Sequence, residues 1–243
     1  MRTVDEQLQD PADRVEDGDS PGTGGTGLPG WDSVLAVVAH PDDESFGLGA
    51  VLSGLADAGA EVSVLCLTRG EASTLHGVPG DLTALRAGEL TAAAQELGVG
   101  DVTLLTHPDG ALADVDTGEL AEQVVAIARR SGAQALVGFD LSGVSGHPDH
   151  VAATQVAVQA ADVLGIPVLG WTLPVGVARQ LREEYGAPFD GHEEVDVDVV
   201  LPVDRERQLR AVRCHASQAV PGSVLWRRLE LLGDTEHLRW LRR

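Results

Sequence analysis

Lysine is absent and aromatic residues are scarce in this chain of 243 residues. All 17 basic residues are arginine, and against 38 acidic residues they leave a formal net charge of −21. Such a surface repels phosphate backbones and anionic lipid, so we expect neither a nucleic-acid nor a membrane partner. Because aromatic residues make up only 3% of the chain, alanine, valine and leucine must fill the core. This favours helices packed on a valine-rich sheet over a β-sandwich.

Long apolar runs and a cysteine framework are also missing. No apolar stretch approaches the ~20 residues of a membrane span, and the N-terminus lacks the basic-then-apolar pattern of a secretory signal. We therefore expect a soluble, cytoplasmic protein. Cys66 and Cys214 are too few and too far apart for a disulfide framework or a cysteine metal site, so we expect reduced packing residues.

Residues 1–30 differ in composition from the rest of the chain. They carry seven acidic residues against Arg2 and Arg14, and they end in a glycine-rich and proline-containing stretch without apolar periodicity. This composition predicts a disordered acidic tail, followed by a single domain over 31–243. The glycines of the tail follow no strand and open no helix, which argues against a phosphate-binding loop.

From residue 34 onward, buried strands alternate with helices. This alternation predicts an α/β fold, a Rossmann-like and mainly parallel sheet with helices on both faces and right-handed crossovers. An extra edge strand at 195–203 and C-terminal helices, one from 204 to about 216 and one from 223, complete the expected domain. The other expected strands are 34–40, 61–68, 101–107, 135–140 and 168–174, and the other expected helices are 48–59, 82–98, 118–132 and 148–165.

Histidine and aspartate cluster in two loops that follow two of these strands. The sequence His-Pro-Asp-Asp-Glu (40–44) follows the first strand, and Gly-His-Pro-Asp-His (146–150) follows the fourth. If the strand order is 3-2-1-4-5, the two loops face each other at the switch point where ligands bind in such sheets. The acids and Pro148 could simply form a turn and cap helices. Neither histidine is needed for capping, so we favour a metal site of two histidines and a carboxylate.

The sequence Ala-His-Pro-Asp-Asp-Glu (39–44) with Gly-His-Pro-Asp-His (146–150) resembles the PIG-L or LmbE-like zinc-dependent de-N-acetylases. This family includes deacetylases of mycothiol and bacillithiol synthesis. The resemblance runs from about Trp31 to Gln218 and includes further segments in the family order: 68–71, 86–90, 108–110 and 215–218.

The resemblance implies roles for the residues of both loops. It assigns Asp42 as the general base toward a metal-bound water that attacks an amide carbonyl, and His147 as the group that stabilises the oxyanion and protonates the leaving amine. We expect His147 to act as an imidazolium, oriented by Asp149. The implied ligands of Zn²⁺, or of Fe²⁺, which suits the same donor set, are His40, Asp43 and His150.

The resemblance also implies that Arg86 and Asp109 bind sugar hydroxyls. Arg86 could instead pair with Glu89 or Asp81 on its helix, and Asp109 could only form a turn. We interpret the second His-Pro-Asp sequence, 107–109, as a coincidence, because the third strand lies farther from the expected metal.

Two positions depart from the expected family pattern. Ser145 stands where mycothiol-pathway members are expected to carry an aromatic residue, and Gln208 stands about where relatives often carry lysine. The sequence therefore leaves the substrate open, and it leaves open the roles of His76, His107 and His215.

The sequence thus predicts a metal-dependent hydrolase that removes an N-acetyl group from an N-acetylglucosamine-type conjugate, a small molecule; a homo-oligomer is left open. One alternative is a nucleotide-binding module without hydrolytic chemistry. It is supported by Gly47 and Gly49 after the first strand, but the next glycine is Gly54, which breaks the dinucleotide fingerprint. The other alternative, a metal-binding protein without turnover, is opposed by the presence of Asp42 and His147.

Overall fold

The computed structural model describes residues 27–75 and 81–243. The predicted disorder of the tail falls mostly on residues 1–26, and His76 falls in the second gap, so both lie outside the described residues. None of the described helices is long and apolar enough to cross a membrane.

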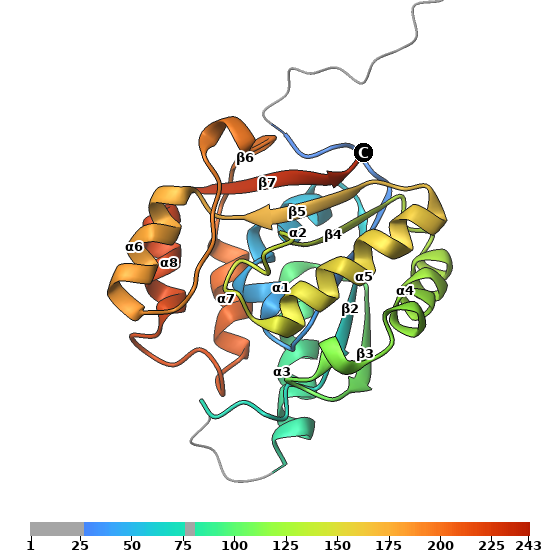
Figure 1. Ribbon diagram of the computed structural model, residues 1–243, viewed down its shortest axis with the longest axis horizontal. Coiled ribbons are helices and arrows are strands. Elements are labelled where there is room, and N and C mark those ends of the chain that lie inside the picture. The colour runs from blue at the N-terminus through green and yellow to red at the C-terminus, as the bar shows by residue number, and fades with distance from the viewer. Residues whose placement is uncertain (1–26, 76–80) are drawn as a thin grey trace, which may run out of the picture.

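Within the described residues the strands form one seven-stranded sheet (Figure 1) in the order β3-β2-β1-β4-β5-β7-β6. The first five strands run parallel, and β7 runs antiparallel to both β5 and β6. The predicted order 3-2-1-4-5 is confirmed. The strands are β1 Ser33–Val38, β2 Glu61–Thr68, β3 Asp101–His107, β4 Ala135–Phe139, β5 Val168–Thr172, β6 Val199–Pro202 and β7 Thr235–Arg242.

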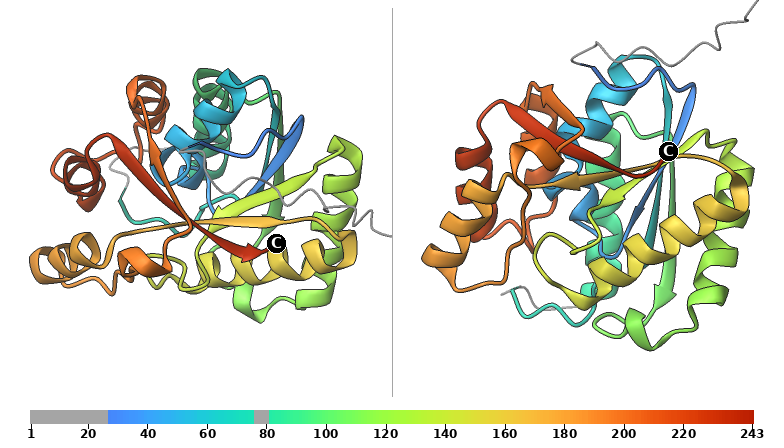
Figure 2. Two further views of the ribbon diagram at one scale, coloured as in Figure 1. Left: turned by 90° about the horizontal axis from the view of Figure 1, so that it is seen from above. Right: turned by 45° about the horizontal axis from the view of Figure 1, so that its top comes forward.

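Helices cover both faces of the sheet, as predicted (Figure 2). Helices α4 and α5 pack on one face and α2, α3 and α7 on the other, while α6 packs against α8 beyond β5. The helices are α1 Asp43–Phe46, α2 Gly49–Asp57, α3 Leu82–Leu97, α4 Thr117–Ser131, α5 Pro148–Leu164, α6 Val175–Tyr185, α7 Glu206–Cys214 and α8 Val224–Leu232, with short 3₁₀ turns at Leu112–Asp114 and Glu194–Asp196.

The central strand β1 shows why the sheet needs helices on both sides. All six of its residues are buried. Val34, Ala36 and Val38 pack into the core beneath α2 and α3, and Leu35 and Val37 pack into the core beneath α4 and α5. A continuous apolar run of this kind is typical of a parallel strand that is covered on both faces. Neither cysteine forms a disulfide, as predicted.

Local signals in the sequence set the ends of the long helices. At the start of α3, the Asp81 side chain accepts hydrogen bonds from the backbone N–H groups of Thr83 and Ala84. At its end, Gly98 has a left-handed backbone with φ 78°, which glycine adopts without strain. These caps explain why the predicted bounds of this helix, 82–98, agree with the structure to within a residue.

Two elements of the C-terminal third were not predicted, α6 and β7. Only Ala178 and Leu181 of α6 are buried, and β7 buries only Glu236 and Leu238. The predicted edge strand at 195–203 is present only over Val199–Pro202, as β6, because Glu194–Asp196 form a 3₁₀ turn, and β7 lies between β6 and β5. The pairing of β7 with two strands, which sequence does not show, determines this placement.

Candidate active site

The first loop of the site begins where β1 ends. His40, Asp43 and Glu44 are buried there, and α1 starts at Asp43. Asp42 has φ 136°, a conformation that costs a non-glycine residue of order 1 to 3 kcal/mol. Its backbone N–H donates to the carboxylate of Glu44 (N to Oε2, 2.9 Å), which holds the strained turn.

The second loop follows β4, the neighbour of β1 in the sheet. It contains Val144 with φ 61°, and within the described part of the chain Val144 and Asp42 are the two non-glycine residues with positive φ. Backbone strain of this kind concentrates at functional sites. The loop is held at its start by Asp140, which contacts Arg239 (2.9 Å) and His192 (3.2 Å).

The two loops bring one nitrogen from each of two imidazoles close to the two oxygens of one carboxylate. His40 Nδ1 lies 3.2 Å from His150 Nε2. Asp43 Oδ1 lies 3.2 Å from His150 Nε2, and its Oδ2 lies 3.5 Å from His40 Nδ1. Ligand atoms at ~2.0 to 2.2 Å from a tetrahedral zinc ion are roughly 3.3 to 3.6 Å apart. The spacing therefore fits a divalent cation held by two imidazoles and one carboxylate.

The outer nitrogen of each imidazole also has a partner. His40 Nε2 lies 3.1 Å from Asp109 Oδ1 and 3.3 Å from Asp149 Oδ2, and His150 Nδ1 lies 3.2 Å from the carbonyl oxygen of Gly143. Outer acceptors of this kind fix the tautomer and ring orientation of metal-binding histidines. Asp43 Oδ2 is held by the backbone N–H groups of Ala39 (3.2 Å) and His40 (2.8 Å).

The charges at this point favour a cation. Burial raises the pKa of Asp43, but His150 and His40 lower it more, to well below the usual aspartate value. Burial lowers the pKa of His40, but hydrogen bonds to Asp109, Asp149 and Asp43 raise it well above the usual value. Ionised carboxylates thus surround His40 on several sides, as a metal centre requires.

A cavity of about 450 Å³ opens onto these ligand atoms. Its polar end contains the residues of the two loops together with Asp42, Arg86, Asp109 and His147. Its apolar and aromatic wall is formed by Phe46, Val144, Phe139, Trp171 and Leu225, and Phe139 packs against His150 with 4.9 Å between the ring centres. The cavity is large enough for a small organic ligand.

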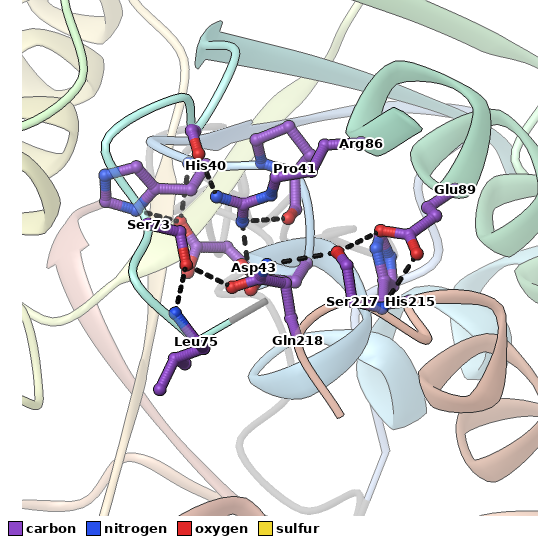
Figure 3. A network of polar contacts seen from close by, with 12 residues as sticks. His40, Pro41, Asp43, Ser73, Leu75, Arg86, Glu89, His215, Ser217 and Gln218 are labelled. Atoms are coloured by element: carbon purple, nitrogen blue, oxygen red, sulfur yellow. Dashed lines mark hydrogen bonds and ion pairs between the residues drawn. The ribbon is translucent and has the colours of Figure 1, made fainter. Parts of the chain in front are cut away.

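Asp42 lines this cavity beside the buried guanidinium of Arg86, which Figure 3 shows next to Pro41. Its Oδ2 lies 3.1 Å from Arg86 Nη2, and Arg86 also donates to the carbonyl oxygens of Gly70 (2.6 Å) and Pro41 (2.5 Å). Burial raises the pKa of Asp42 to about 6, against the opposing effect of Arg86. A carboxyl group with such a pKa can exchange protons near neutral pH.

The segment 215–218 supports the site from behind (Figure 3). The buried His215 donates from Nε2 to Glu44 (2.6 Å), and Glu89 accepts from both the backbone N–H (2.8 Å) and the hydroxyl (2.6 Å) of Ser217. Gln218 accepts from the hydroxyl of Ser73 (2.7 Å), which ties the loop after β2 to the C-terminal third. His215, whose role the sequence left open, thus supports the Glu44 carboxylate that holds Asp42.

Comparison with known proteins agrees with this geometry. Residues 35–161 match the PIG-L family model, described as GlcNAc-PI de-N-acetylase. The chain belongs to the PIG-L family. This membership confirms the prediction from the two His-Pro-Asp loops, and with it the predicted class of enzyme, a deacetylase.

Curated relatives of this PIG-L protein include two 1D-myo-inositol 2-acetamido-2-deoxy-alpha-D-glucopyranoside deacetylases. The Kineococcus radiotolerans protein is 35% identical over 76% of this chain and 68% of its own length. The Streptomyces avermitilis protein is 35% identical over 65% of this chain and 58% of its own. The crystal structure of the zinc-inhibited form of teicoplanin deacetylase matches 86% of this chain and 97% of that one with a TM-score of 0.64. At 22% identity, this likeness shows a common fold.

His147 in the PIG-L protein has a contact that the sequence did not predict. It is the N-cap of α5, and its Nδ1 accepts from the backbone N–H of Asp149 (3.2 Å). The statement that neither histidine is needed for capping was therefore wrong for His147. Because Nδ1 is an acceptor, the neutral ring carries its proton on Nε2. Burial, followed by the charges of His40 and His150, lowers the pKa of His147, which favours this neutral form over the predicted imidazolium.

The carboxylate of Asp149 also has another partner than predicted. Instead of orienting His147, it accepts from the backbone N–H groups of Gly110 (2.7 Å) and Leu112 (3.1 Å) and faces His40. It thus joins the loop after β3 to the metal-binding end of the cavity. The orientation of His147 comes from the backbone of Asp149.

Asp109 reaches the site although β3 is two strands away from β1. Its Oδ1 lies 3.1 Å from His40, and its Oδ2 accepts from the backbone N–H of Ala72 (2.8 Å). The interpretation of residues 107–109 as a coincidence was therefore wrong for Asp109. His107 itself lies beside Gln123 on α4, at 2.8 Å.

The predicted sugar contact of Arg86 stays a prediction. The structure places its guanidinium on Asp42 rather than on Glu89 or Asp81. This position of the guanidinium beside Asp42 needs a glycine at residue 70, because a Cβ atom there would lie 1.9 Å from Arg86 Nη1.

The two departures from the family pattern lie on opposite sides of the site. Ser145 lines the cavity, with its hydroxyl 3.1 Å from His150 Nδ1. The buried Gln208 donates to the carbonyl oxygen of Ser45 (3.0 Å) and thereby braces α1. The glycines behind the nucleotide-binding alternative serve packing, since a Cβ atom at Gly47 would lie 2.4 Å from Phe139 and one at Gly49 would lie 2.7 Å from Gln208.

Proposed function

We propose that the protein removes the N-acetyl group from a small N-acetylglucosamine-type conjugate, with a divalent cation held by His40, Asp43 and His150. The observation that carries this proposal is the convergence of two imidazoles and one carboxylate on an open cavity: His150 Nε2 lies 3.2 Å from His40 Nδ1 and from Asp43 Oδ1, and Asp43 Oδ2 lies 3.5 Å from His40 Nδ1. Zinc is favoured by the preference of this donor set, and Fe²⁺ is the alternative. When bound, the cation supplies Lewis-acid chemistry, which polarises the amide carbonyl and acidifies a water molecule.

Two side chains of the cavity handle protons and developing charge. The Asp42 carboxylate, with its raised pKa, takes the proton of the attacking water. Once protonated, it can return that proton to the nitrogen of the leaving amine. Neutral His147 donates from Nε2 to the oxygen of the amide carbonyl, where negative charge develops. Arg86 keeps Asp42 turned toward the cavity.

The substrate class comes from the relatives together with the cavity. The two curated relatives are named for a 2-acetamido-2-deoxyglucopyranoside linked to inositol. Here the cavity extends from the ligand atoms to an aromatic wall that includes Phe139 and Trp171, and apolar sugar faces pack well on such walls. Asp109, at the edge of the cavity, offers a carboxylate for a sugar hydroxyl. A small conjugate fits this arrangement.

A screen of N-acetylglucosamine conjugates with detection of the free amine tests this function. The zinc-loaded protein should release one acetate for each amine formed, and a chelator should stop the reaction. Binding of the metal without release of amine from any N-acetyl sugar would support the alternative without turnover.

The pH dependence should report Asp42. Because the base acts ionised and its pKa is raised to about 6, kcat/KM should fall by about tenfold per pH unit on the acidic side. The bound cation favours the ionised form of Asp42, so the fall in kcat/KM should begin at or below pH 6. Stopped assays between pH 4 and pH 8 measure it, with metal content followed in parallel because acid also releases metal from histidine. If the fall in kcat/KM on the acidic side only follows the loss of metal, Asp42 is not the group that causes it.

His147→Ala should lower kcat by about 10² to 10³, the usual cost of losing a donor to an oxyanion. It should also remove the N-cap of α5, at a cost of about 1 kcal/mol in the free energy of unfolding. Bound metal should stay near the wild-type amount.

His147→Asn separates the two effects. Asparagine is among the best N-caps, so the variant should recover thermal stability, while its shorter side chain leaves the rate low. Recovery of the rate together with the stability would show that His147 acts only as a cap.

A further inference from the structure

The first turn of α8 forms part of the cavity wall. Ser223, Val224, Leu225 and Arg228 all line the cavity that also contains the metal ligands. These residues follow His150 by more than 70 positions, and no motif of the sequence marks them. One of these residues is Arg228, a charged residue of the cavity wall that has no carboxylate within ion-pair distance among the described residues.

Arg228 is held as a cation by few contacts. Its Nη2 donates to the carbonyl oxygen of Phe46 (2.7 Å), and its guanidinium carbon lies 5.0 Å from the centre of the Trp171 ring. Its Nε is buried without a hydrogen-bond partner. Within residues 27–75 and 81–243, no carboxylate lies within ion-pair distance of it.

The other arginine of the cavity wall differs in this respect. Arg86 has the Asp42 carboxylate 3.1 Å away. Burial lowers the pKa of Arg228 to about 10, against the opposing charges of Glu236, Asp43 and Asp42, and Arg228 stays charged at neutral pH. None of these carboxylates is within ion-pair distance, so an anion that binds directly beside the guanidinium lowers the cost of its burial.

Ser223 adds a second donor without a partner. It occupies the N-cap position of α8, but its side chain makes no capping hydrogen bond. Its hydroxyl oxygen is buried and has no hydrogen-bond partner. The first N–H groups of a helix have no acceptor within the helix, and the helix dipole favours negative charge there. A hydroxyl, a guanidinium and a helix N-terminus therefore line the same stretch of wall.

We propose that Arg228, Ser223 and the N-terminus of α8 form a subsite for an anionic oxygen group, a carboxylate or a phosphate, carried by the amino-sugar substrate. The guanidinium offers the paired donors that such groups prefer. The proposal rests on the proposed deacetylase function and narrows its substrate to an acidic N-acetyl conjugate. In a chain of net charge −21, a local cation is needed to hold an anion in the cavity.

The test compares acidic and neutral sugars on the zinc-loaded protein. N-acetylglucosamine is the neutral substrate, and N-acetylglucosamine 1-phosphate, N-acetylglucosamine 6-phosphate and N-acetylmuramic acid are the acidic ones. At least one acidic sugar should show a kcat/KM above that of N-acetylglucosamine by on the order of tenfold or more. Whether a phosphate sugar or N-acetylmuramic acid has the higher kcat/KM shows which group, phosphate or carboxylate, the subsite binds.

Arg228→Gln should reduce this ratio of acidic to neutral kcat/KM by on the order of tenfold, mainly through KM. Arg228→Lys keeps the charge without the paired donors, so its ratio should lie between those of the wild type and Arg228→Gln. This second variant also guards against the case in which Arg228→Gln fails to fold. Arg182→Gln is the matched control. Arg182 also donates to one backbone carbonyl, that of Phe189 (2.5 Å), but does not line the cavity, so this variant should leave the ratio unchanged.

The outcomes separate the subsite from the function. Turnover of N-acetylglucosamine without preference for any acidic sugar, or an unchanged ratio in Arg228→Gln, would overturn the subsite and leave the deacetylase function standing. If no N-acetyl sugar is turned over, the function fails. The subsite is then judged by calorimetric titration of the protein and of Arg228→Gln with the same four sugars. In that titration, equal dissociation constants for acidic and neutral sugars would overturn the subsite.

Discussion

Replacing Asp42 by alanine should lower kcat by about 10² to 10⁴, while the metal and the fold are retained. Asp42 is adjacent to the proposed ligand Asp43, but its own carboxylate faces Arg86 rather than the ligand atoms. Its pKa is raised by burial to about 6. A positioned proton acceptor is therefore lost without loss of a ligand. Single-turnover rates and metal content, measured on the same preparations, check this result.

The strained backbone of Asp42 calls for a second variant. Asp42→Asn keeps the size and hydrogen-bonding capacity of the side chain at φ 136°, a conformation that asparagine and aspartate tolerate better than most residues. It should lose nearly as much rate as alanine, because the amide cannot take the proton. A rate near that of the wild type in Asp42→Asn, with metal bound, would exclude Asp42 as the base.

The parallel half of the fold could be predicted because its signals are local. Each strand from β1 to β5 is a short apolar run, and Gly98 and Gly165 end the helices that follow β2 and β4. The order 3-2-1-4-5 could be proposed because that winding makes the strands before the two His-Pro-Asp loops neighbours. The place of β7 could not be predicted, since its position between β5 and β6 depends on pairing with both strands.

The site shows the same division between local and distant signals. The proposed ligands lie within a few residues of a recognisable motif, so their meeting could be predicted from sequence. The partners of Asp149 and His147 could not, because they depend on how the loop after β3 and the start of α5 pack. Arg228 lies on α8, in a helix whose pattern shows only an amphipathic surface, so its position in the cavity was missed. Sequence thus identified the proposed metal ligands but not the proposed anion subsite.

Replacing His150 by alanine should remove most of the bound metal and, with it, nearly all turnover. His150 Nε2 lies 3.2 Å from both His40 Nδ1 and Asp43 Oδ1, so its loss leaves only two of the three proposed ligands. Zinc sites of this kind need three protein ligands. Metal content after dialysis, measured together with the rate, checks the result. His107→Ala is the matched control, because His107 also precedes a Pro-Asp pair but contacts Gln123, and it should keep its metal.

The comparison with His147→Ala decides between two possible ligand sets. The ring nitrogens of His147, His40 and His150 lie close enough to one another for these three residues to share an ion. We assign His150 rather than His147 because of the position of the ring proton. His147 Nδ1 accepts from the backbone of α5, so its Nε2 carries the proton and cannot bind a metal. His150 Nδ1 faces the carbonyl oxygen of Gly143 and donates to it, which leaves the lone pair of Nε2 for the metal. If His147→Ala loses metal while His150→Ala keeps it, the ligand and the oxyanion donor are reversed.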